Sequence, residues 1–343
     1  MNKLRVGILA PSEIAFRRFL PALHKVSAFE YAGVAVANES EWFGDAVTDD
    51  EKADRCAQIK VAVDKAKLFR ESYGGEVYES YTSLIAAENI DAVYVPLPPA
   101  LHYKWAKLVA EHGKHILVEK PFTTSARNSK DLIETARKNN VAVHENYMFR
   151  FHSQLDFIKS VIEQGEIGEV RLYRLDFCFP FRGANDFRYV KELGGGALLD
   201  CGGYPIRLAN ILLGGNAKVI ASQLNGKSGF DVDIYGNLTM QNADGVVAQI
   251  SFGMDNAYKG SLEIIGSTGT LFASRAYTAP ADFEPVVIVT NADGTKEHAL
   301  PADDSFKKSI EYFYACVFDD NERAKSEKAI LKQAEFIDAV GGK

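Results

Sequence analysis

The sequence predicts an α/β protein of two domains. A doubly wound parallel sheet is expected over residues 1–146, because short apolar runs alternate there with helical patterns. An α+β domain with a large, mostly antiparallel open sheet is expected over residues 147–343, because runs of strand length follow one another from residue 169 onward with few helices between them. The length of 343 residues is enough for each domain to bury its own core.

The chain opens with an apolar run of strand length at residues 5–10, and a helical pattern begins near Ile14. Strand, tight turn and helix are how a dinucleotide-binding domain begins, with G-x-G-x-x-G/A at the turn. This chain has Ala10, Pro11, Ser12, Glu13, Ile14 and Ala15 there instead. Ala10 costs little if its φ stays negative, Ser12 offers a hydroxyl to a phosphate, and Pro11 removes an amide donor. We expect residues 10–14 to contact the cofactor.

A second strand is predicted over residues 31–37, and it ends at Asn38 and Glu39. A carboxylate at this place can accept a hydrogen bond from the ribose 2′-hydroxyl, whereas a 2′-phosphate favours arginine. The cofactor is therefore NAD or NADP, with a mild lean to NAD. Residues 42–73 are polar and helical in pattern, and the sequence gives them no role.

Further short strands are predicted at residues 76–78 and 91–95. The loop after the second of these contains Pro98, and a proline-stiffened loop suits a wall against a flat ring. His102 follows at the start of a helix. It could touch the substrate or the cofactor, but helix capping or packing explains it equally well.

The most apolar strand, residues 115–118, ends at Glu119, Lys120 and Pro121. In an open parallel sheet the ligand crevice lies outside the carboxyl ends of the strands, so Lys120 should point into the site. We expect Glu119 and Lys120 at the cofactor and Lys120 in catalysis. The alternative is a solvated charge at the end of a strand.

A second group of residues with catalytic chemistry runs from Gly194 to Tyr204. Its glycines would let the backbone approach a ligand, and an apolar helical stripe follows. Asp200 and Tyr204 are four residues apart, which on a helix places a carboxylate and a phenol on one face. An ammonium such as that of Lys120 would favour the ionised phenol and make it a proton donor and acceptor. The alternative is a buried helix with Tyr204 in the core.

The second domain shows six strand patterns, at residues 169–178, 219–224, 235–241, 246–253, 261–265 and 286–290. A helix near residues 197–213 would cover one face of this sheet, and the open face would join copies into a homodimer or homotetramer. Two amphipathic helices, residues 304–318 and 326–340, finish the chain.

Composition excludes several classes of function. The net charge of −7 argues against nucleic acid or an anionic membrane as a partner. The four cysteines have no metal-binding or disulfide spacing, so no metal site is predicted and a reducing compartment fits. The strand pattern begins too early for a signal peptide, and no apolar run reaches membrane-spanning length. We expect a cytoplasmic protein.

Together these motifs resemble the Gfo/Idh/MocA oxidoreductases along essentially the whole chain. The resemblance is carried by residues 110–115, Glu119-Lys120-Pro121, residues 145–152 and residues 194–204. Within that family the chain looks most like the nucleotide-sugar 3-ketoreductases of deoxysugar biosynthesis, through residues 187–189, 204–207, 266–269 and 283–287.

The resemblance implies a Rossmann domain that binds a nicotinamide cofactor and a sugar as substrate. Hydride would pass to the keto group of a nucleotide-linked hexose, with Tyr204 as the acid, Lys120 at the reacting oxygen and Asp200 in contact with the substrate. Arg188, Tyr189 and Arg275 would also bind the substrate. Arg182, Arg188 and Arg275 are candidates for a phosphate clamp, with ordinary surface arginines as the alternative. Two other functions stay open: a dehydrogenase for a free aldose or cyclic diol, and a non-catalytic sensor that lost its grip on the cofactor.

Overall fold

The computed structural model describes residues 3–43, 49–183 and 185–342, without the side chains of residues 42–55. By packing, the chain divides into two compact units. Unit 1 comprises Met1–Phe122, Arg127–Asn146 and Ile310–Ile330, and unit 2 comprises Thr123–Ala126, Tyr147–Ser309 and Leu331–Lys343. One division thus falls at the predicted boundary after residue 146. Residues 310–330 differ, because they pack in unit 1 although the sequence analysis placed them with the rest of 147–343. The division into two functional domains remains a prediction.

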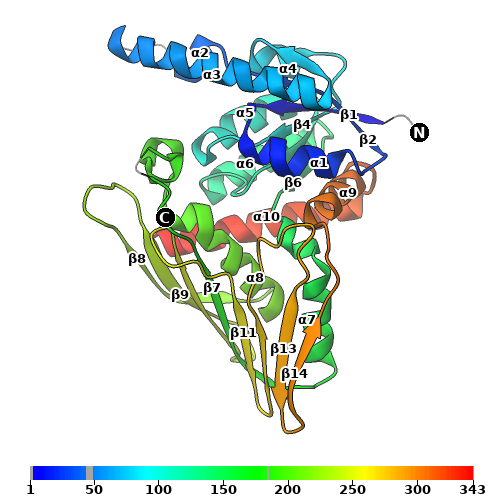
Figure 1. Cartoon of the computed structure of the whole chain (residues 1–343), viewed down its shortest axis with the longest axis vertical. Coiled ribbons are helices and arrows are strands. Elements are labelled where there is room, and N and C mark those ends of the chain that lie inside the picture. The colour runs from blue at the N-terminus through cyan, green and yellow to red at the C-terminus, as the bar shows by residue number, and fades with distance from the viewer. Residues whose placement is uncertain (1–2, 44–48, 184, 343) are drawn as a thin grey trace. The chain divides into compact units, whose positions relative to one another are not determined.

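Unit 1 is built on a six-stranded sheet in which every pair of neighbouring strands is parallel (Figure 1). The strands lie in the order β3-β2-β1-β4-β5-β6. They are β1 (Leu4–Leu9), β2 (Phe29–Ala35), β3 (Glu76–Tyr78), β4 (Ala92–Val95), β5 (His115–Val118) and β6 (Val143–Glu145). The order reverses between β1 and β4, so unit 1 has the predicted doubly wound topology. Ligands bind at such a reversal, outside the carboxyl ends of the strands.

The helices of unit 1 follow the strands as the alternation of patterns predicts. They are α1 (Leu20–Leu23), α2 (Glu39–Phe43), α3 (Asp49–Tyr73), α4 (Tyr81–Ala86), α5 (Pro99–Glu111) and α6 (Ala126–Lys138), and a π-helical turn, η1 (Ala15–Phe19), precedes α1. The long polar segment without a predicted role is α3. Phe19 of η1 stacks on Tyr94 of β4 with ring centroids 3.9 Å apart, so the first crossover is anchored in the core.

Two C-terminal helices, α9 (Ser305–Phe318) and α10 (Asp320–Gly341), contribute to both units. In unit 1, Phe313 of α9 stacks on Phe29 of β2 with centroids 6.0 Å apart, and Ser326 of α10 donates a hydrogen bond to the Val143 carbonyl. Burial of apolar side chains such as Phe313 against the parallel sheet is what places residues 310–330 in unit 1.

Unit 2 contains an eight-stranded sheet in the order β14-β13-β12-β11-β7-β10-β9-β8 (Figure 1). The strands are β7 (Val170–Cys178), β8 (Lys218–Asn225), β9 (Tyr235–Gln241), β10 (Val247–Gly253), β11 (Leu262–Gly266), β12 (Thr270–Ala273), β13 (Val286–Asn291) and β14 (Gly294–Ala299). Only β7 and β10 pair in parallel, so the sheet is mostly antiparallel as predicted. Strands β12 and β14 were not predicted: β12 has four residues, and β14 is a polar edge strand.

Helix α8 (Gly203–Leu213) packs on β7 and β10 and covers one face of this sheet. It follows directly on a π-helical turn, η5 (Leu198–Gly202). Helix α7 (Ser153–Glu163), which was not predicted, and the short 3₁₀ turns η2 (Met148–Phe151), η3 (Phe187–Tyr189) and η4 (Lys191–Leu193) complete unit 2. On the strands, side chains such as Ile220, Tyr235, Phe272 and Val286 are exposed.

Among the described helices, none combines the length and the apolar character needed to cross a lipid bilayer.

Candidate active site

The turn after β1 keeps a glycine-like backbone without a glycine. Ala10 has a φ of 73°, in the left-handed region, and its N–H donates to the Ala35 carbonyl at 3.1 Å. The condition under which Ala10 would cost little, a negative φ, is therefore not met. The tight turn between strand and helix fixes the backbone, and alanine adopts it at a cost of about 1–2 kcal/mol. The turn geometry of a dinucleotide-binding loop is thus present despite the altered sequence.

The other residues of this loop are used locally. The Ser12 hydroxyl oxygen accepts a hydrogen bond from the Ala15 N–H at 3.2 Å, as a helix cap does. Glu13 is exposed and forms an ion pair with Arg17 at 3.2 Å, which offsets its negative charge. Pro11 is buried and Ile14 is half-buried. Their predicted contact with a cofactor stays a prediction.

An open cavity of about 610 Å³ lies at the carboxyl ends of β2 and β3. Its lining includes the apolar side chains Val36, Ala37, Ile59, Val63 and Val77 and the polar or charged side chains Asn38, Glu39, Lys60, Tyr78 and Glu79. This size is in the range of small-molecule sites, and the position is that of the adenosine half of a dinucleotide in a doubly wound sheet. The residues present therefore fit a nicotinamide dinucleotide.

Glu41 holds the loop that carries Asn38 and Glu39. Its carboxylate accepts hydrogen bonds from the backbone N–H groups of Asn38, Tyr81 and Thr82 at 2.9–3.1 Å, and from the Thr82 hydroxyl at 2.8 Å. No sequence pattern marks Glu41, because its bonds to Tyr81 and Thr82 join positions about forty residues apart. The loop is thereby tied to the start of α4 while Glu39 lines the cavity.

The strand end that carries Lys120 is held by a network of buried polar groups. The Glu119 carboxylate accepts hydrogen bonds from the Tyr94 hydroxyl and the Asn146 side-chain amide, both at 2.7 Å. Burial raises the pKa of Glu119, and these hydrogen bonds oppose that effect. Lys120 lies two residues beyond the last residue of β5, Val118, and is half-buried. The network fixes the backbone from which its ammonium extends.

His102 links two loops of unit 1. Its ring is fully buried, and its nitrogens lie 2.7 Å from the Pro121 carbonyl oxygen and 2.6 Å from the Leu97 carbonyl oxygen. Burial lowers the pKa of His102 to about 4. This arrangement corresponds to the packing alternative, in which His102 holds the loop of Pro98 against the loop after Lys120. Contact of His102 or Pro98 with the cofactor stays a prediction.

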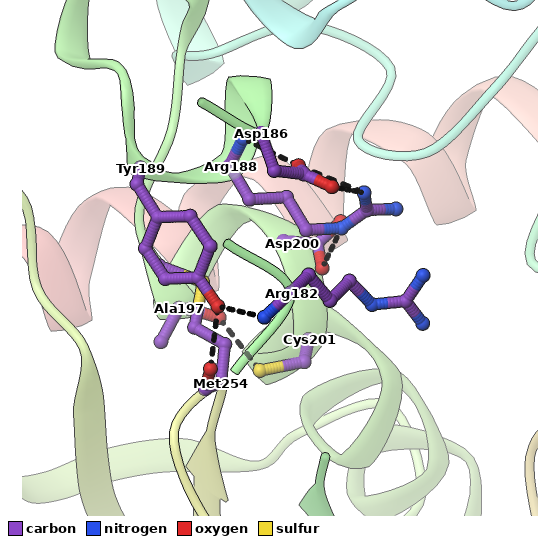
Figure 2. Close-up of polar contacts among 8 residues, drawn as sticks. All are labelled: Arg182, Asp186, Arg188, Tyr189, Ala197, Asp200, Cys201 and Met254. Atoms are coloured by element: carbon purple, nitrogen blue, oxygen red, sulfur yellow. Dashed lines mark hydrogen bonds and ion pairs between the residues drawn. The ribbon is translucent and has the colours of Figure 1, made fainter. Parts of the chain in front are cut away.

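In unit 2, Arg188 lies between two carboxylates (Figure 2). Its Nε donates to Asp200 at 2.8 Å, and its terminal nitrogen donates to both oxygens of Asp186 at 3.1 and 3.2 Å. Burial opposes the charge, but the two carboxylates raise the pKa of Arg188 above its ordinary value. Asp186, which the sequence analysis missed, also accepts a hydrogen bond from the Arg188 N–H as the cap of η3. The predicted residues Arg188 and Asp200 are thus brought together.

The glycines before Asp200 allow close packing within the chain. A Cβ on Gly195 would lie 2.5 Å from the Arg188 carbonyl oxygen, and one on Gly196, whose φ is 120°, would overlap the Asp233 carboxylate. Asp233 accepts a hydrogen bond from the Leu198 N–H at 2.6 Å and so caps η5. These contacts within the chain account for Gly195 and Gly196, and the approach of a ligand to this segment stays a prediction. Asp200 and Tyr204 also do not share one regular α-helix as predicted. Asp200 lies in the π-helical turn η5, and Tyr204 lies in α8.

Tyr204 lies in a cage of aromatic rings. Its centroid is 5.2 Å from that of Tyr147, 5.9 Å from Phe149, 4.9 Å from Phe177 and 6.2 Å from Tyr277. The residue is 7% exposed, so the cage fixes the ring.

The remaining predicted substrate residues are held by their neighbours. The Tyr189 hydroxyl donates to the Met254 carbonyl at 2.6 Å and accepts from the Arg182 N–H at 3.2 Å (Figure 2). The Arg275 guanidinium lies 5.6 Å from the Tyr258 ring and 5.4 Å from the Phe283 ring, and its Nε donates to a carbonyl. Among the described residues, no group of three or more His, Cys, Asp or Glu side chains could hold a metal ion.

A doubly wound sheet, a cavity at the position of the adenosine half and a strand end that presents a lysine are features of dinucleotide-binding proteins. Two family models match the chain: "Oxidoreductase family, NAD-binding Rossmann fold" over residues 35–147 and "GFO/IDH/MocA C-terminal domain" over residues 156–272. The chain belongs to the Gfo/Idh/MocA family of oxidoreductases. Its N-terminal domain is the NAD(P)-binding Rossmann domain of that family, and membership favours the enzyme over the sensor alternative.

The relatives include several sugar reductases. The chain is 37% identical over 339 residues to a dTDP-3,4-didehydro-2,6-dideoxy-α-D-glucose 3-reductase of Actinomadura kijaniata. The matched region covers 99% of this chain and 95% of the relative. It is 28% identical to D-xylose 1-dehydrogenase (NADP⁺) 2 of Haloferax volcanii, over 97% of this chain and 95% of the relative.

A solved structure of KijD10, a 3-ketoreductase from Actinomadura kijaniata in complex with NADP and TDP-benzene, superposes with a TM-score of 0.89 at 36% identity. The match covers 99% of this chain and 98% of KijD10. Further KijD10 structures carry a tyrosine-to-phenylalanine substitution or a lysine-to-alanine substitution.

Proposed function

We propose that this enzyme reduces the keto group of a nucleotide-linked deoxyhexose, with Lys120 and Tyr204 as its catalytic residues. The observation that carries the proposal is this pair. The lysine and the tyrosine that are substituted in the KijD10 structures are separated by the same number of residues as Lys120 and Tyr204. The high coverage of the dTDP-sugar 3-reductase supports the same substrate class.

In the proposed mechanism the bound dinucleotide supplies a hydride to the carbonyl carbon. Tyr204 donates its phenolic proton to the carbonyl oxygen as that oxygen becomes an alkoxide. The Lys120 ammonium stabilises the negative charge that develops on the oxygen and on the phenolate left behind. Asp200 orients the sugar through its hydroxyl groups, and the ion pair with Arg188 keeps its carboxylate in place.

The test combines a substrate with two matched pairs of variants. We expect wild-type protein to consume reduced cofactor, followed by absorbance, when a dTDP-linked 3-keto-deoxyhexose is added. Tyr204→Phe and Lys120→Ala should each lower turnover at least about a hundredfold with the fold intact by circular dichroism. Tyr235→Phe and Lys138→Ala remove the same groups from exposed positions and should keep the wild-type rate. Wild-type rates in the Tyr204 or Lys120 variant would remove that residue from the mechanism.

We propose NADPH as the reductant. The support comes from the KijD10 structures, which carry NADP, and it outweighs the mild lean to NAD drawn from Glu39. Lys60 lines the cavity and offers a cation to a 2′-phosphate, whereas Glu39 and Glu79 oppose that phosphate. Comparing the dissociation constants of NADPH and NADH by intrinsic fluorescence decides this choice.

A dehydrogenase of free aldoses or cyclic diols is the second candidate, favoured by the similarity to the xylose dehydrogenase. The same pair would then act in reverse, with the tyrosine as base. Oxidation of D-xylose with NADP⁺ at a rate above that of the keto-sugar reduction would favour this candidate.

We further propose that the open face of the unit 2 sheet joins copies of the chain into a dimer or tetramer. Phe272 and Val286 are 39% and 40% exposed on neighbouring strands, which supports a covered face. Light scattering should give a dimer or tetramer for wild type and a smaller species for Phe272→Asp. A cytoplasmic setting is proposed as well, since Cys56, Cys178, Cys201 and Cys316 are not joined by disulfides.

A further inference from the structure

The proposed substrate carries a diphosphate, and three arginines of unit 2 were candidates to bind it. Arg188 is already neutralised, because Asp186 and Asp200 both contact its guanidinium. An added phosphate would meet a group of three side chains whose net charge is −1. Arg275 is half-buried, its Nε donates to the Thr278 carbonyl, and its guanidinium lies 5.6 Å from the Tyr258 ring and 5.4 Å from the Phe283 ring. Arg188 therefore offers no uncompensated charge to a new anion, and the guanidinium of Arg275 is partly covered by its neighbours.

Arg182 differs from both. It is exposed, and among the described residues no carboxylate forms an ion pair with it. Its backbone is held because the Arg182 backbone N–H donates to the Tyr189 hydroxyl. Its side chain is oriented because the guanidinium carbon lies 4.8 Å from the centre of the Phe179 ring. In Figure 2 the side chains of Arg182 and Arg188 extend in the same direction, and Asp200 is drawn between them. An oriented, unpaired cation thus borders the predicted sugar-binding residues.

The residue next to Arg182 adds a second observation. Phe181 is 43% exposed, and its ring is backed by two others, with centroids 4.7 Å from Tyr189 and 5.9 Å from Phe230. Tyr189 is itself fixed by its hydrogen bond to the Met254 carbonyl. A ring that is held by two neighbours and is still 43% exposed offers a stacking surface to a nucleobase. Lys227, the other cation near this ring, is already paired with Asp255.

We propose that Phe181 and Arg182 form the nucleoside diphosphate subsite of the enzyme. Arg182 binds the diphosphate, Phe181 stacks on the pyrimidine ring, and Arg188 holds Asp186 and Asp200 instead of binding phosphate. This inference rests on the proposed nucleotide-linked substrate. It transfers the phosphate-binding role from Arg188 and Arg275 to Arg182.

The test measures binding without catalysis, by titration calorimetry of the full-length protein with thymidine 5′-diphosphate and with thymidine. Arg182→Gln should weaken diphosphate binding at least about tenfold and leave thymidine binding unchanged. Phe181→Ala should weaken both ligands by about tenfold. Arg171→Gln, which removes an exposed arginine at the start of β7 that pairs with Glu169, should change neither.

Steady-state kinetics provide a second readout. With the nucleotide-linked keto-sugar, Arg182→Gln should raise KM at least about tenfold and leave kcat within about threefold, because the residue binds a part of the substrate remote from the carbonyl. Wild-type affinity for thymidine diphosphate in Arg182→Gln would overturn the subsite and leave the proposed reaction standing. A wild-type protein that binds no thymidine diphosphate would overturn the nucleotide-linked substrate and the subsite with it.

Discussion

At the scale of single residues, Ala10 shows how the fold imposes a conformation that the side chain disfavours. Its φ of 73° predicts that Ala10→Gly raises the free energy of unfolding by about 0.5–1 kcal/mol. The strain energy that glycine removes from the folded state is larger than the free energy it costs by giving the unfolded chain more conformational entropy. Urea titration checks the change. Ala22→Gly, in the helix α1, should instead destabilise by about 1 kcal/mol. Equal destabilisation by both variants would contradict the assigned strain.

Arg188 is the second residue whose role depends on its partners. Arg188→Met leaves the carboxylates of Asp186 and Asp200 without their shared cation, in side-chain positions that are 22% and 9% exposed. We expect a loss of about 2 kcal/mol in the free energy of unfolding, less than for a fully buried pair. Adding Asp186→Asn to Arg188→Met should recover part of that loss, because one uncompensated charge is removed. A double variant as unstable as the sum of the two single variants would argue against this coupling.

At the scale of elements, the segment after β2 carries the charged side chains that would lie near the ribose 2′-position of a bound cofactor. Glu39 lines the cavity, and Glu41 ties its loop to α4. Removing the Glu39 charge should tighten NADPH binding about three- to tenfold and leave NADH binding unchanged or slightly weaker. Fluorescence titration of Glu39→Gln with both cofactors tests this, with Glu71→Gln on the exposed side of α3 as the control. An equal effect on both cofactors would exclude a role in selectivity.

The start of α8 depends on the absence of a side chain at Gly203. A Cβ there would overlap the Tyr147 hydroxyl, and Tyr147 packs edge-on against Tyr204. Gly203→Ala should therefore destabilise unit 2 by about 1–3 kcal/mol. Gly215→Ala, where a Cβ meets open space, is the control. Thermal unfolding measures both, and adding Tyr147→Phe to Gly203→Ala should relieve the overlap. No gain from that second change would mean that the strain lies elsewhere.

The sequence predicted most elements, but not the contacts that depend on turns. Short apolar runs predicted the central strands β1, β4 and β5 of unit 1, since a strand buried on both faces is recognised locally. The polar edge strand β14 lacks that signal. The pairing of Arg188 with Asp200, twelve residues on, depends on the glycine turn and the π-helical turn between them. Neither conformation follows from hydrophobic periodicity. The positive φ of Ala10 was not predicted for the same reason, because the turn sets φ at that position.

At the scale of the whole molecule, the two units hold different parts of the proposed mechanism. Lys120 and the dinucleotide cavity belong to unit 1, and Tyr204, Arg188 and Asp200 belong to unit 2. Each unit must therefore keep its own fold for activity. Each unit also contains a histidine whose Nδ1 accepts a backbone hydrogen bond: the half-buried His115 from Ala142 at 3.0 Å, and the buried His152 from Gln154 at 3.1 Å. An acceptor nitrogen requires the neutral ring, so protonation breaks these bonds.

These histidines predict a common loss of stability in mild acid. Burial, followed by the nearby Arg323, lowers the pKa of His115 to about 4, and burial also lowers the pKa of His152. Between the folded pKa and the ordinary value near 6.5, the unfolded chain binds a proton that the folded chain does not. The free energy of unfolding therefore rises with pH through this window. The stability is complete above about pH 6.5 and is lost as the pH falls toward 4, by about 2 kcal/mol for the half-buried His115.

Asparagine separates titration from hydrogen bonding at both sites, because its side-chain oxygen takes the place of Nδ1 and does not titrate. His115→Asn and His152→Asn should each flatten the dependence of the urea midpoint on pH between 7 and 5, with the bond to the backbone retained. At His152, which caps α7, asparagine is also a favourable cap. His112→Asn, at an exposed position, should leave the pH profile unchanged. If His115→Asn and His152→Asn lose stability toward pH 5 as steeply as wild type, other groups govern the acid sensitivity and the neutral rings are not its source.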